Sequence, residues 1–239
     1  MESAGSVRLN KYLASCALGS RRHVEDLVHQ GRVEVDGKRA LSPGERVGPG
    51  GRVRVDGRVV MPRELCYVVC YKPRGVVCAV WDRFYPTVLT VLPPKFQDRG
   101  LFPVGRLDKD SEGLLILTND GDFAQSVAHP RFGVTKKYRA ELSRPMDAED
   151  LGRWRRGVDL EGRWVVPEGV DRFSGGVEVT LREGMKREVR MMARALGYEV
   201  TRLIRVAIGA LKWEKLPPGG WMTFSREELW CMIRAGGLV

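Results

Sequence analysis

The sequence of 239 residues contains no uninterrupted run of about 20 apolar residues, the length that an α-helix needs to cross a bilayer. Its first residues lack the apolar segment of a secretory signal, so we expect a cytoplasmic protein without a membrane partner. The sequence also has no P-loop, no dinucleotide-binding fingerprint and no spaced group of metal ligands. These signatures therefore give no indication of a bound nucleotide, redox cofactor or structural metal.

Cysteine is scarce, with five residues, and their number is odd. Their spacing matches neither a zinc site nor a redox Cys-x-x-Cys pair. Their neighbours are mostly apolar, which favours small buried thiols in a reducing compartment. The cysteines are Cys16, Cys66, Cys70, Cys78 and Cys231.

Positive charge is in excess, with 40 Lys and Arg against 30 Asp and Glu and a formal net charge of +10. A basic protein attracts polyanions, so nucleic acid is the favoured class of partner. Hydrophobic residues make up 43% of the chain, which is enough for a buried core and excludes a wholly disordered protein.

Composition changes after about residue 57, which predicts two domains. The first sixty residues hold 11 basic and 7 acidic side chains, about twice the net charge density of the rest. A stretch rich in Gly, Arg and Val leads to Met61 and Pro62, and a new apolar run follows. We place a linker at 58–65 and predict domains over 1–60 and 61–239.

The pattern of the first domain predicts two helices followed by short strands. Leu9, Tyr12, Leu13 and Cys16 recur at helical spacing, and a second apolar face follows Ser20, a predicted N-cap. Alternating residues then predict strands within 32–37 and 52–57, each ending in an Asp-Gly turn.

Two arginines begin the second predicted helix, where the helix dipole disfavours cations unless an anion binds there. A phosphate held by free backbone N–H groups and guanidinium groups would explain them, although two solvated arginines are the simpler alternative. Other basic residues could extend the same RNA-facing surface. The candidates are Arg8, Lys11, Arg21, Arg22, Arg32 and Lys38.

Residues 105–121 are the part of the second domain that we expect to carry chemistry. Gly-Arg-Leu-Asp-Lys-Asp-Ser-Glu-Gly precedes Leu-Leu-Ile-Leu-Thr and an Asn-Asp-Gly turn, so a polar loop leads into a buried strand. Asp108 in this loop could be a nucleophile, a general base or a metal ligand. An exposed Asp-Arg pair without function is an equally open alternative.

Two further segments predict a sheet position and an amphipathic helix. Tyr138 lies in an alternating run that is typical of a strand, where tyrosine is usually a core residue. Residues 187–196 predict a helix with an apolar face and a basic face formed by Arg187, Arg190 and Arg194. A solvated basic stripe would explain that face equally simply. We also predict a terminal helix near 226–234.

Two resemblances combine these observations. Residues 7–37, with their Gly-Ser-Arg-Arg turn and Gly-Arg-Val-Glu-Val-Asp-Gly strand, resemble the small RNA-binding domain first described in ribosomal protein S4. The run beginning at Gly105 resembles the signature of the pseudouridine synthases, specifically the RsuA-type ribosomal-RNA branch that carries such a domain. Residues 136–138 resemble the family's Lys-x-Tyr strand, and 183–190 resemble its third motif.

The resemblance implies roles for individual residues. It implies that Asp108 is the catalytic carboxylate, that Tyr138 packs against the target uracil, and that Arg190 pairs with Asp108. Ser111 replaces a frequent threonine, and Met191 replaces a second arginine, which implies softer packing or one lost RNA contact. Further RNA contacts are expected from Arg106, Lys137, Arg187 and Arg194.

The implied reaction isomerises uridine without a cofactor or metal. The implied partner is ribosomal RNA or a pre-ribosomal particle, bound by a protein that we expect to be a monomer. His129-Pro130 and the complete first domain favour large-subunit RNA, with small-subunit RNA as the alternative. The fold class is α+β: a small helical and β RNA-binding domain, then a synthase domain with a mostly antiparallel sheet.

Three other functions stay open on the residues alone. Asp108, Asp110, Asp120 and Asp122 could hold two magnesium ions in a nuclease. The chain could instead be a non-catalytic RNA-binding or ribosome-assembly protein. A glycosidase with Asp108 and Asp110 as its acid pair is disfavoured, because residues separated by one position point oppositely on a strand.

Overall fold

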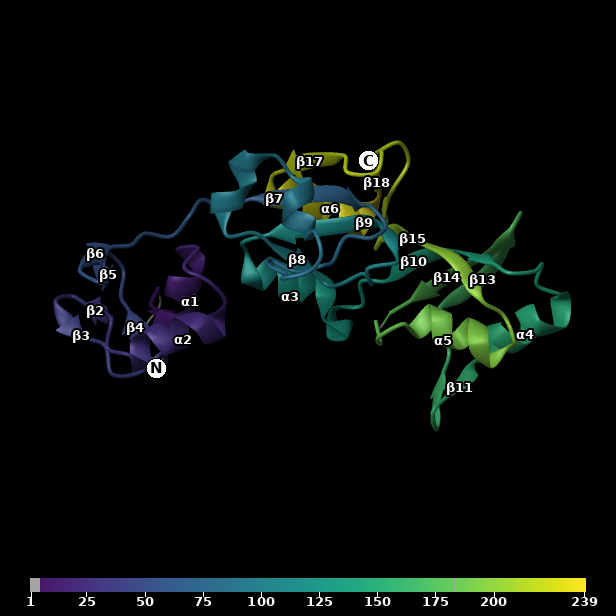
Figure 1. Cartoon of the computed structure of the whole chain (residues 1–239), viewed down its shortest axis with the longest axis horizontal. Helices are drawn as coiled ribbons and strands as arrows, with labels where there is room; N and C mark the ends of the chain where they lie inside the picture. Colours follow the sequence, from purple (N-terminus) through teal and green to yellow (C-terminus); the bar gives the residue numbers. More distant parts are fainter. Residues whose placement is uncertain (1–4, 183) are drawn as a thin grey trace. The chain divides into compact units, whose positions relative to one another are not determined.

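The computed structural model describes residues 5–182 and 184–239, and these form two compact units (Figure 1). The first unit contains the chain up to Cys66 together with Pro93–Leu101. The second unit contains Tyr67–Leu92 and Phe102–Val239. The second unit therefore holds every residue implicated in the chemistry.

The first unit has two helices and a small antiparallel sheet, as the sequence predicts. The Ser20 hydroxyl accepts a hydrogen bond from the His23 amide, so Ser20 is the N-cap of the second helix. Leu9, Leu13 and Val24 are fully buried in the core between helices and sheet. The elements are α1 (Leu9–Ser15), α2 (Arg21–His29), β1 (Val7–Arg8), β2 (Val33–Val35), β3 (Lys38–Arg39), β4 (Arg46–Val47), β5 (Val53–Val55) and β6 (Arg58–Val59).

The first unit extends beyond the predicted boundary at residue 60. β6 lies at the start of the predicted linker and pairs with β5, because Asp56 and Gly57 turn the chain back on itself. Farther along, the Arg63 amide donates to the Ser15 carbonyl, and Gly100 lies against Ala17. The short η2 helix (Pro94–Arg99) belongs to this unit, an addition that local sequence patterns do not indicate.

The second unit is built on one ten-stranded sheet of mostly antiparallel pairs, which confirms the predicted fold class. The strand order is β13-β14-β10-β15-β9-β7-β17, with three short strands attached at β9, β15 and β16. The strands are β7 (Tyr67–Lys72), β8 (Phe102–Val104), β9 (Glu112–Thr118), β10 (Lys136–Leu142), β13 (Gly169–Phe173), β14 (Gly176–Leu181), β15 (Val200–Ile208), β16 (Leu211–Lys212), β17 (Trp221–Phe224) and β18 (Gly237–Leu238). A separate hairpin pairs β11 (Val158–Leu160) with β12 (Arg163–Val165).

Two predicted helices of this unit are confirmed, and two others were missed. α5 (Glu188–Ala195) and α6 (Arg226–Ala235) match the predictions, and a Ser225–Glu228 capping box begins α6. The predicted Asn-Asp-Gly turn is wrong, because Asp120 caps α3 (Gly121–Ala128) by accepting from two backbone amides. α4 (Ala148–Arg156) was also missed, although Asp147 caps it by accepting from the Asp150 amide.

The second unit has two main hydrophobic cores, and residues 105–111 pass between them. Val104 and Leu114, which flank this loop, belong to the core under α3 and α6. Leu107, inside the loop, belongs instead to the core under α4 and α5. Asp108 follows Leu107 directly, so burial of apolar side chains in both cores fixes the position of Asp108.

The shortest strand pairing along the main strand order of the sheet is the one between β9 and β15. β9 and β15 pair in parallel over only two positions, which align Glu112 with Ile204 and Gly113 with Arg205. The active loop, residues 105–111, ends immediately before this junction. The position of the loop therefore depends on how closely these two strands approach.

The predicted buried state of the cysteines is only partly correct. Cys16 and Cys70 are buried, whereas Cys66 and Cys78 are half-buried. Cys231 is exposed, because its position on α6 faces away from the core that Leu229 and Ile233 enter. All five are free thiols. Over residues 5–182 and 184–239, no helix has the length and apolar character needed to cross a membrane.

Candidate active site

A hollow of about 320 Å³ lies where the active loop, β10 and the start of α5 meet. The loop contributes Arg106, Leu107, Asp108 and Ser111, while β10 contributes Tyr138. The opposite wall comes from residues 184–189. Three segments far apart in the sequence thus place a carboxylate, an aromatic ring and two arginines, Arg106 and Arg187, around one space.

The loop that carries Asp108 is held by hydrogen bonds to the end of β7. The Lys109 carbonyl accepts from the Gly75 amide at 2.8 Å and from the Lys72 ammonium at 3.3 Å. Within the loop, the Ser111 amide donates to the Asp108 carbonyl at 3.1 Å. The backbone at Asp108 and Lys109 is therefore held before any ligand binds.

Lys72 is a fully buried lysine at the end of β7. Its ammonium also donates to the Pro73 carbonyl at 2.9 Å. Burial lowers the pKa of Lys72, and the nearby Cys78, Glu112, Asp110 and Asp108 oppose that shift. Because this ammonium group donates its hydrogen bonds to backbone carbonyls, Lys72 is a positioning residue for the loop.

Tyr138 has two roles in the structure. It is 9% exposed and belongs to the core under α4 and α5, as a tyrosine on a sheet usually does. Tyr138 also lines the hollow that Asp108 lines. A register shift between Lys137 and Tyr138, opposite β15, occurs at this position of the strand.

The wall formed by α5 begins at Arg187, which stands at the N-cap with a left-handed φ of 58°. This conformation is unfavourable for a residue with a side chain, by about 1–2 kcal/mol. Buried Glu188 accepts from the Met185 amide at 2.9 Å and so fixes the turn before the helix. The first turn of α5 therefore faces the hollow with a basic side chain.

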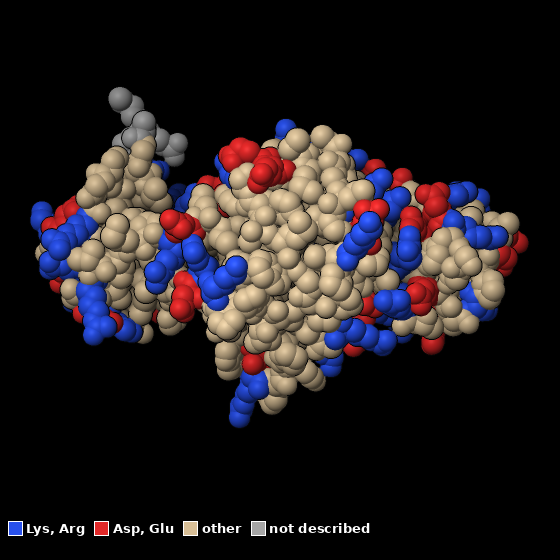
Figure 2. Space-filling model, turned by 90° about the horizontal axis from the view of Figure 1, so that it is seen from above, with Lys and Arg blue, Asp and Glu red and all other residues tan. Residues whose placement is uncertain are grey.

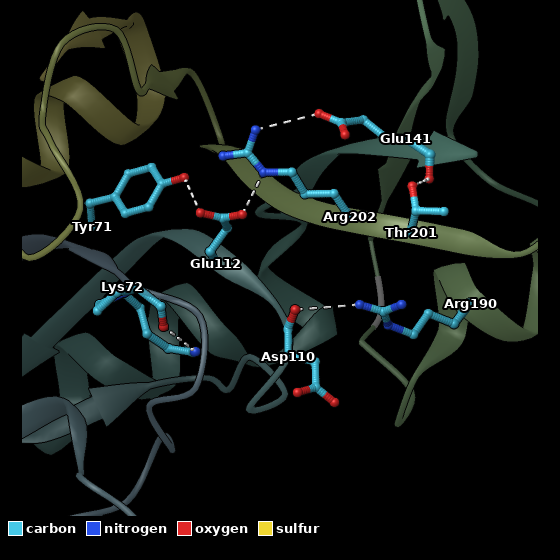
Figure 3. Close-up of polar contacts among 9 residues, drawn as sticks. Tyr71, Lys72, Asp110, Glu112, Glu141, Arg190, Thr201 and Arg202 are labelled. Atoms are coloured by element: carbon cyan, nitrogen blue, oxygen red, sulfur yellow. Dashed lines mark hydrogen bonds and ion pairs between the residues drawn. The ribbon is translucent and has the colours of Figure 1, made fainter. Parts of the chain in front are cut away.

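The pairing of Arg190 with Asp108 that the resemblance implies is not a direct ion pair here. The Arg190 guanidinium donates to the Val200 carbonyl at 2.7 Å and, at 3.5 Å, to the Asp110 carbonyl (Figure 3). Burial lowers the pKa of Arg190, against the opposing charges of Asp108 and Asp110. Arg190 therefore lies beside the loop, where the charges of Asp108 and Asp110 favour its charged form.

Ser111 is the least expected polar group of the hollow. It is 1% exposed, and its hydroxyl has no hydrogen-bond partner among the described residues. A buried hydroxyl without a partner costs about 1–3 kcal/mol. The loop therefore carries a polar group whose hydrogen bond is available to a ligand in the hollow.

Glu112 begins β9 and connects three strands through its carboxylate (Figure 3). It accepts from the Tyr71 hydroxyl at 2.9 Å and from the Arg202 guanidinium at 2.6 Å. Arg202 also contacts Glu141 on β10 at 3.5 Å. Burial acts to raise the pKa of Glu112, but the hydrogen bonds and charge of Arg202, the Tyr71 hydrogen bond and the charge of Arg74 outweigh it, so the pKa lies below 4.5.

Glu112→Gln is expected to lower the unfolding free energy of the second unit by about 1–3 kcal/mol at neutral pH, because a neutral amide loses the charge-assisted bonds. A carboxylate whose pKa is lowered in the folded state stabilises the fold at pH values above its ordinary pKa of 4.5. That stabilisation is lost as the pH falls through the pKa of the folded state. The difference between wild type and variant should therefore shrink in acid.

Urea titration followed by tryptophan fluorescence measures this effect, because all six tryptophans lie in the second unit. Glu168→Gln is the matched control, since Glu168 pairs with Arg182 at 2.9 Å on the surface and should change stability by less than about 1 kcal/mol. Equal effects of the two variants, or a difference that grows in acid, would contradict the assignment.

Some residues predicted to contact RNA have partners within the protein. Lys137 contacts Glu178 on β14 at 3.6 Å, because its side chain points to the face of β10 opposite Tyr138. In the first unit, Arg32 forms an exposed pair with Asp56 at 2.6 Å. Arg194 is exposed in the last turn of α5 and is not part of the hollow.

The other predicted residues of the first unit are placed at its surface. Arg21 and Arg22 occupy the exposed first turn of α2, with no acidic side chain in that turn. Arg8 and Lys38 are exposed, and Lys11 is half-buried on α1. On the face shown in Figure 2, acidic side chains are interspersed with the basic ones of this unit.

The carboxylates proposed for a nuclease do not converge. Asp120 lies beyond the far end of β9 from Asp108, about 20 Å away for a seven-residue strand. There it accepts from the Tyr67 hydroxyl and contacts Arg226. The argument against a glycosidase needs correction, because Asp108 and Asp110 lie in a turn rather than on a strand.

Comparison with known proteins decides the family. The sequence model described as RNA pseudouridylate synthase matches residues 66–195, and that of the S4 domain matches residues 7–50. This chain belongs to the RNA pseudouridylate synthases. The synthase match contains Asp108, Tyr138 and Arg190. The predicted enzyme class, an isomerase of the RsuA-type branch with an S4-like domain, is thereby confirmed.

Relatives of this synthase cover nearly the whole chain. An uncharacterized RNA pseudouridine synthase of Aquifex aeolicus is 37% identical and covers 97% of this chain and 96% of its own. Ribosomal large subunit pseudouridine synthase B of Escherichia coli is 40% identical over 90% of this chain and 78% of its own. A crystal structure of a pseudouridylate synthase superposes with a TM-score of 0.68 at 26% identity, covering 94% of this chain and 98% of its own.

Several residues around the synthase hollow were missed from the sequence. Met185 and Lys186 line it, and Lys72 holds its loop. Lys186 could have been included, because it belongs to the basic run that includes Arg187. The burial of Lys72 and the Ser111 hydroxyl, which has no partner among the described residues, have no local sequence signal, because they depend on strands that are distant in the chain.

Proposed function

We propose that this synthase isomerises a specific uridine of ribosomal RNA, with large-subunit RNA as the favoured target and Asp108 as its catalytic carboxylate. The observation that carries the proposal is the shared hollow, in which the Asp108 carboxylate lies beside the Tyr138 ring and two arginines. The name of the Escherichia coli relative supports the choice of large-subunit RNA. Small-subunit RNA is the alternative target.

In the proposed reaction, the N-glycosidic bond of uridine breaks, the uracil turns within the hollow, and a bond forms between the ribose and a ring carbon. That carbon then loses its proton, and the released ring nitrogen gains one. No atom is transferred to another molecule and nothing is oxidised. Asp108 would act on the ribose while the base is detached, and assist the final proton loss.

Tyr138 would pack against the uracil throughout this turn. Its ring position is fixed because it is part of the sheet and of the core behind it. The Ser111 hydroxyl, which lacks a partner among the described residues, could donate to or accept from the bound nucleotide. Arg190 would act as a positioning residue through its hydrogen bond to the loop.

Binding must also offset the removal of uridine from its stack, which costs a few kcal/mol. Arg106, Lys186 and Arg187 line or border the hollow and are exposed, so each can meet a phosphate. The S4-like unit adds Arg21 and Arg22 at the start of α2 as proposed phosphate contacts. These contacts would position the RNA backbone without reading its sequence.

Incubating the purified chain with ribosomal RNA transcripts and with pre-ribosomal particles tests the proposal. Chemical mapping of pseudouridine should show one new site in large-subunit RNA, with unchanged yield in the presence of a chelator. The same site should be missing from ribosomal RNA of cells that lack the gene. A site confined to small-subunit RNA would establish the alternative target. No product in any RNA or particle would overturn the proposed function.

A further inference from the structure

Three large aromatic side chains are exposed in the segment 79–86, which precedes the active loop in the chain. Trp81 is 76% exposed, Phe84 is 78% exposed and Tyr85 is 47% exposed. Such a group of exposed aromatic rings usually marks a binding surface, because exposure of apolar area to water is unfavourable. The hollow around Asp108 does not include these rings.

The segment is a structured loop whose ends are held together. The Val77 amide donates to the Pro86 carbonyl at 3.0 Å, and the Val88 amide returns to the Val77 carbonyl at 2.9 Å. At the tip, the Asp82 carboxylate accepts from the amides of Phe84 and Tyr85 at 2.8 and 2.9 Å. The aromatic rings are therefore presented on a fixed backbone.

This aromatic loop, residues 79–86, is directly attached to the active loop. The Lys109 ammonium lies 4.0 Å from the centroid of the Tyr85 ring, and Lys109 follows Asp108 in the chain. The Leu107 amide donates to the Cys78 sulfur at 3.3 Å. Tyr85 therefore anchors the aromatic loop to the active loop, while Trp81 and Phe84 are left exposed beside it.

We propose that Trp81 and Phe84 form a stacking platform for unpaired RNA bases that flank the target uridine. This inference rests on the proposed function, because it assigns a second part of the same RNA-binding surface. When one base leaves its stack, its neighbours lose a stacking partner, and aromatic side chains replace such partners for any base. The platform would bind single-stranded RNA without reading its sequence.

The charges of the loop favour RNA over a protein partner. Arg83 lies 5.5 Å from the centroid of the Phe84 ring, and Lys109 lies over Tyr85, so cations adjoin the rings. One carboxylate oxygen of Asp82 accepts hydrogen bonds from two backbone amides. A surface of rings with adjacent cations suits bases linked by phosphates. It is also continuous with the active loop that holds the proposed catalytic aspartate.

The platform can be tested with a uridine-rich single-stranded RNA that carries one fluorescent 2-aminopurine base. The affinity of the protein for this RNA and the fluorescence of that base are both measured. Stacking of that base on Trp81 or Phe84 should quench its fluorescence on binding. Trp81→Leu and Phe84→Leu keep an apolar side chain but remove the ring, and each should weaken binding about tenfold or more. Both should reduce the quenching, whereas affinity for a duplex of the same sequence should stay within about twofold, because paired bases do not present their faces.

Trp164→Leu is the matched control, since Trp164 is 63% exposed on β12 of the same unit and should leave both readouts unchanged. Unchanged affinity and quenching in the Trp81 and Phe84 variants would overturn the inference, as would an equal loss in Trp164→Leu. A loss of duplex affinity equal to that for single strands would also overturn it. The assay measures binding without turnover. The platform can therefore be tested even if the proposed reaction does not occur.

Discussion

Asp108→Asn is expected to abolish pseudouridine formation while RNA affinity stays within about threefold of wild type. The amide keeps the shape of the side chain but is neutral, so it can neither attack the ribose nor accept a proton. The fall in rate should exceed about a thousandfold, which is typical of removing a group that acts directly on the reacting atoms. Single-turnover assays with chemical mapping, together with filter binding of the same RNA, would measure both quantities.

Asp110→Asn provides the control for this prediction. Asp110 is exposed two positions along the same loop and does not line the hollow. Its carbonyl, which the substitution leaves unchanged, holds Arg190. The control should retain activity within severalfold, because only a weak field effect is lost. Substantial product from Asp108→Asn, or an equal loss in both variants, would refute the role of Asp108.

Gly113→Ala is expected to destabilise the second unit by more than about 3 kcal/mol. Gly113 has a φ of 109°, and a Cβ atom there would lie 2.4 Å from the Arg205 carbonyl oxygen and 2.7 Å from its nitrogen. Both atoms belong to the backbone of β15, which cannot move away without breaking the two-position junction with β9. Activity should fall as well, because the active loop ends at this junction.

Gly105→Ala distinguishes backbone strain from overlap with β15 as the cause of the lost stability. Gly105 also has a left-handed φ of 71°, but a Cβ atom there would meet no atom within 4 Å. It should therefore cost only the backbone strain of about 1–2 kcal/mol. Urea midpoints from tryptophan fluorescence report on the second unit for both variants. Similar midpoints would mean that the close approach of β15 does not determine stability.

Local patterns predicted those elements that have a strong periodic signal. The first two helices and α5 were predicted from apolar spacing, because one face of each must enter a core. α3 was missed because Asn-Asp-Gly is typical of a turn, whereas here Asp120 caps a helix. Whether the chain turns or begins a helix after Asp120 depends on the core that Phe123 enters.

The candidate site was predictable in part, since its motifs placed Asp108 and Tyr138 in the correct loop and strand. The partners of the basic residues were not predictable. Arg190 meets the Val200 and Asp110 carbonyls, and Lys137 meets Glu178, because a neighbouring strand or the active loop supplies each of these groups. The aromatic loop was equally hidden, since sequence alone does not tell an exposed Trp81 from a buried Trp154.

By itself, the sequence determined the chemistry that is available and the elements that carry it, because side-chain type and apolar period are local properties. It determined the family through motifs whose spacing is preserved within single loops and strands. Only the tertiary structure decided which groups meet. Leu107 enters one core, while Val104 and Leu114 enter the other. Gly113 has no side chain, so the backbone of β15 can approach it closely. Burial and close approach between distant segments fix the carboxylate at the hollow, and no local pattern contains that information.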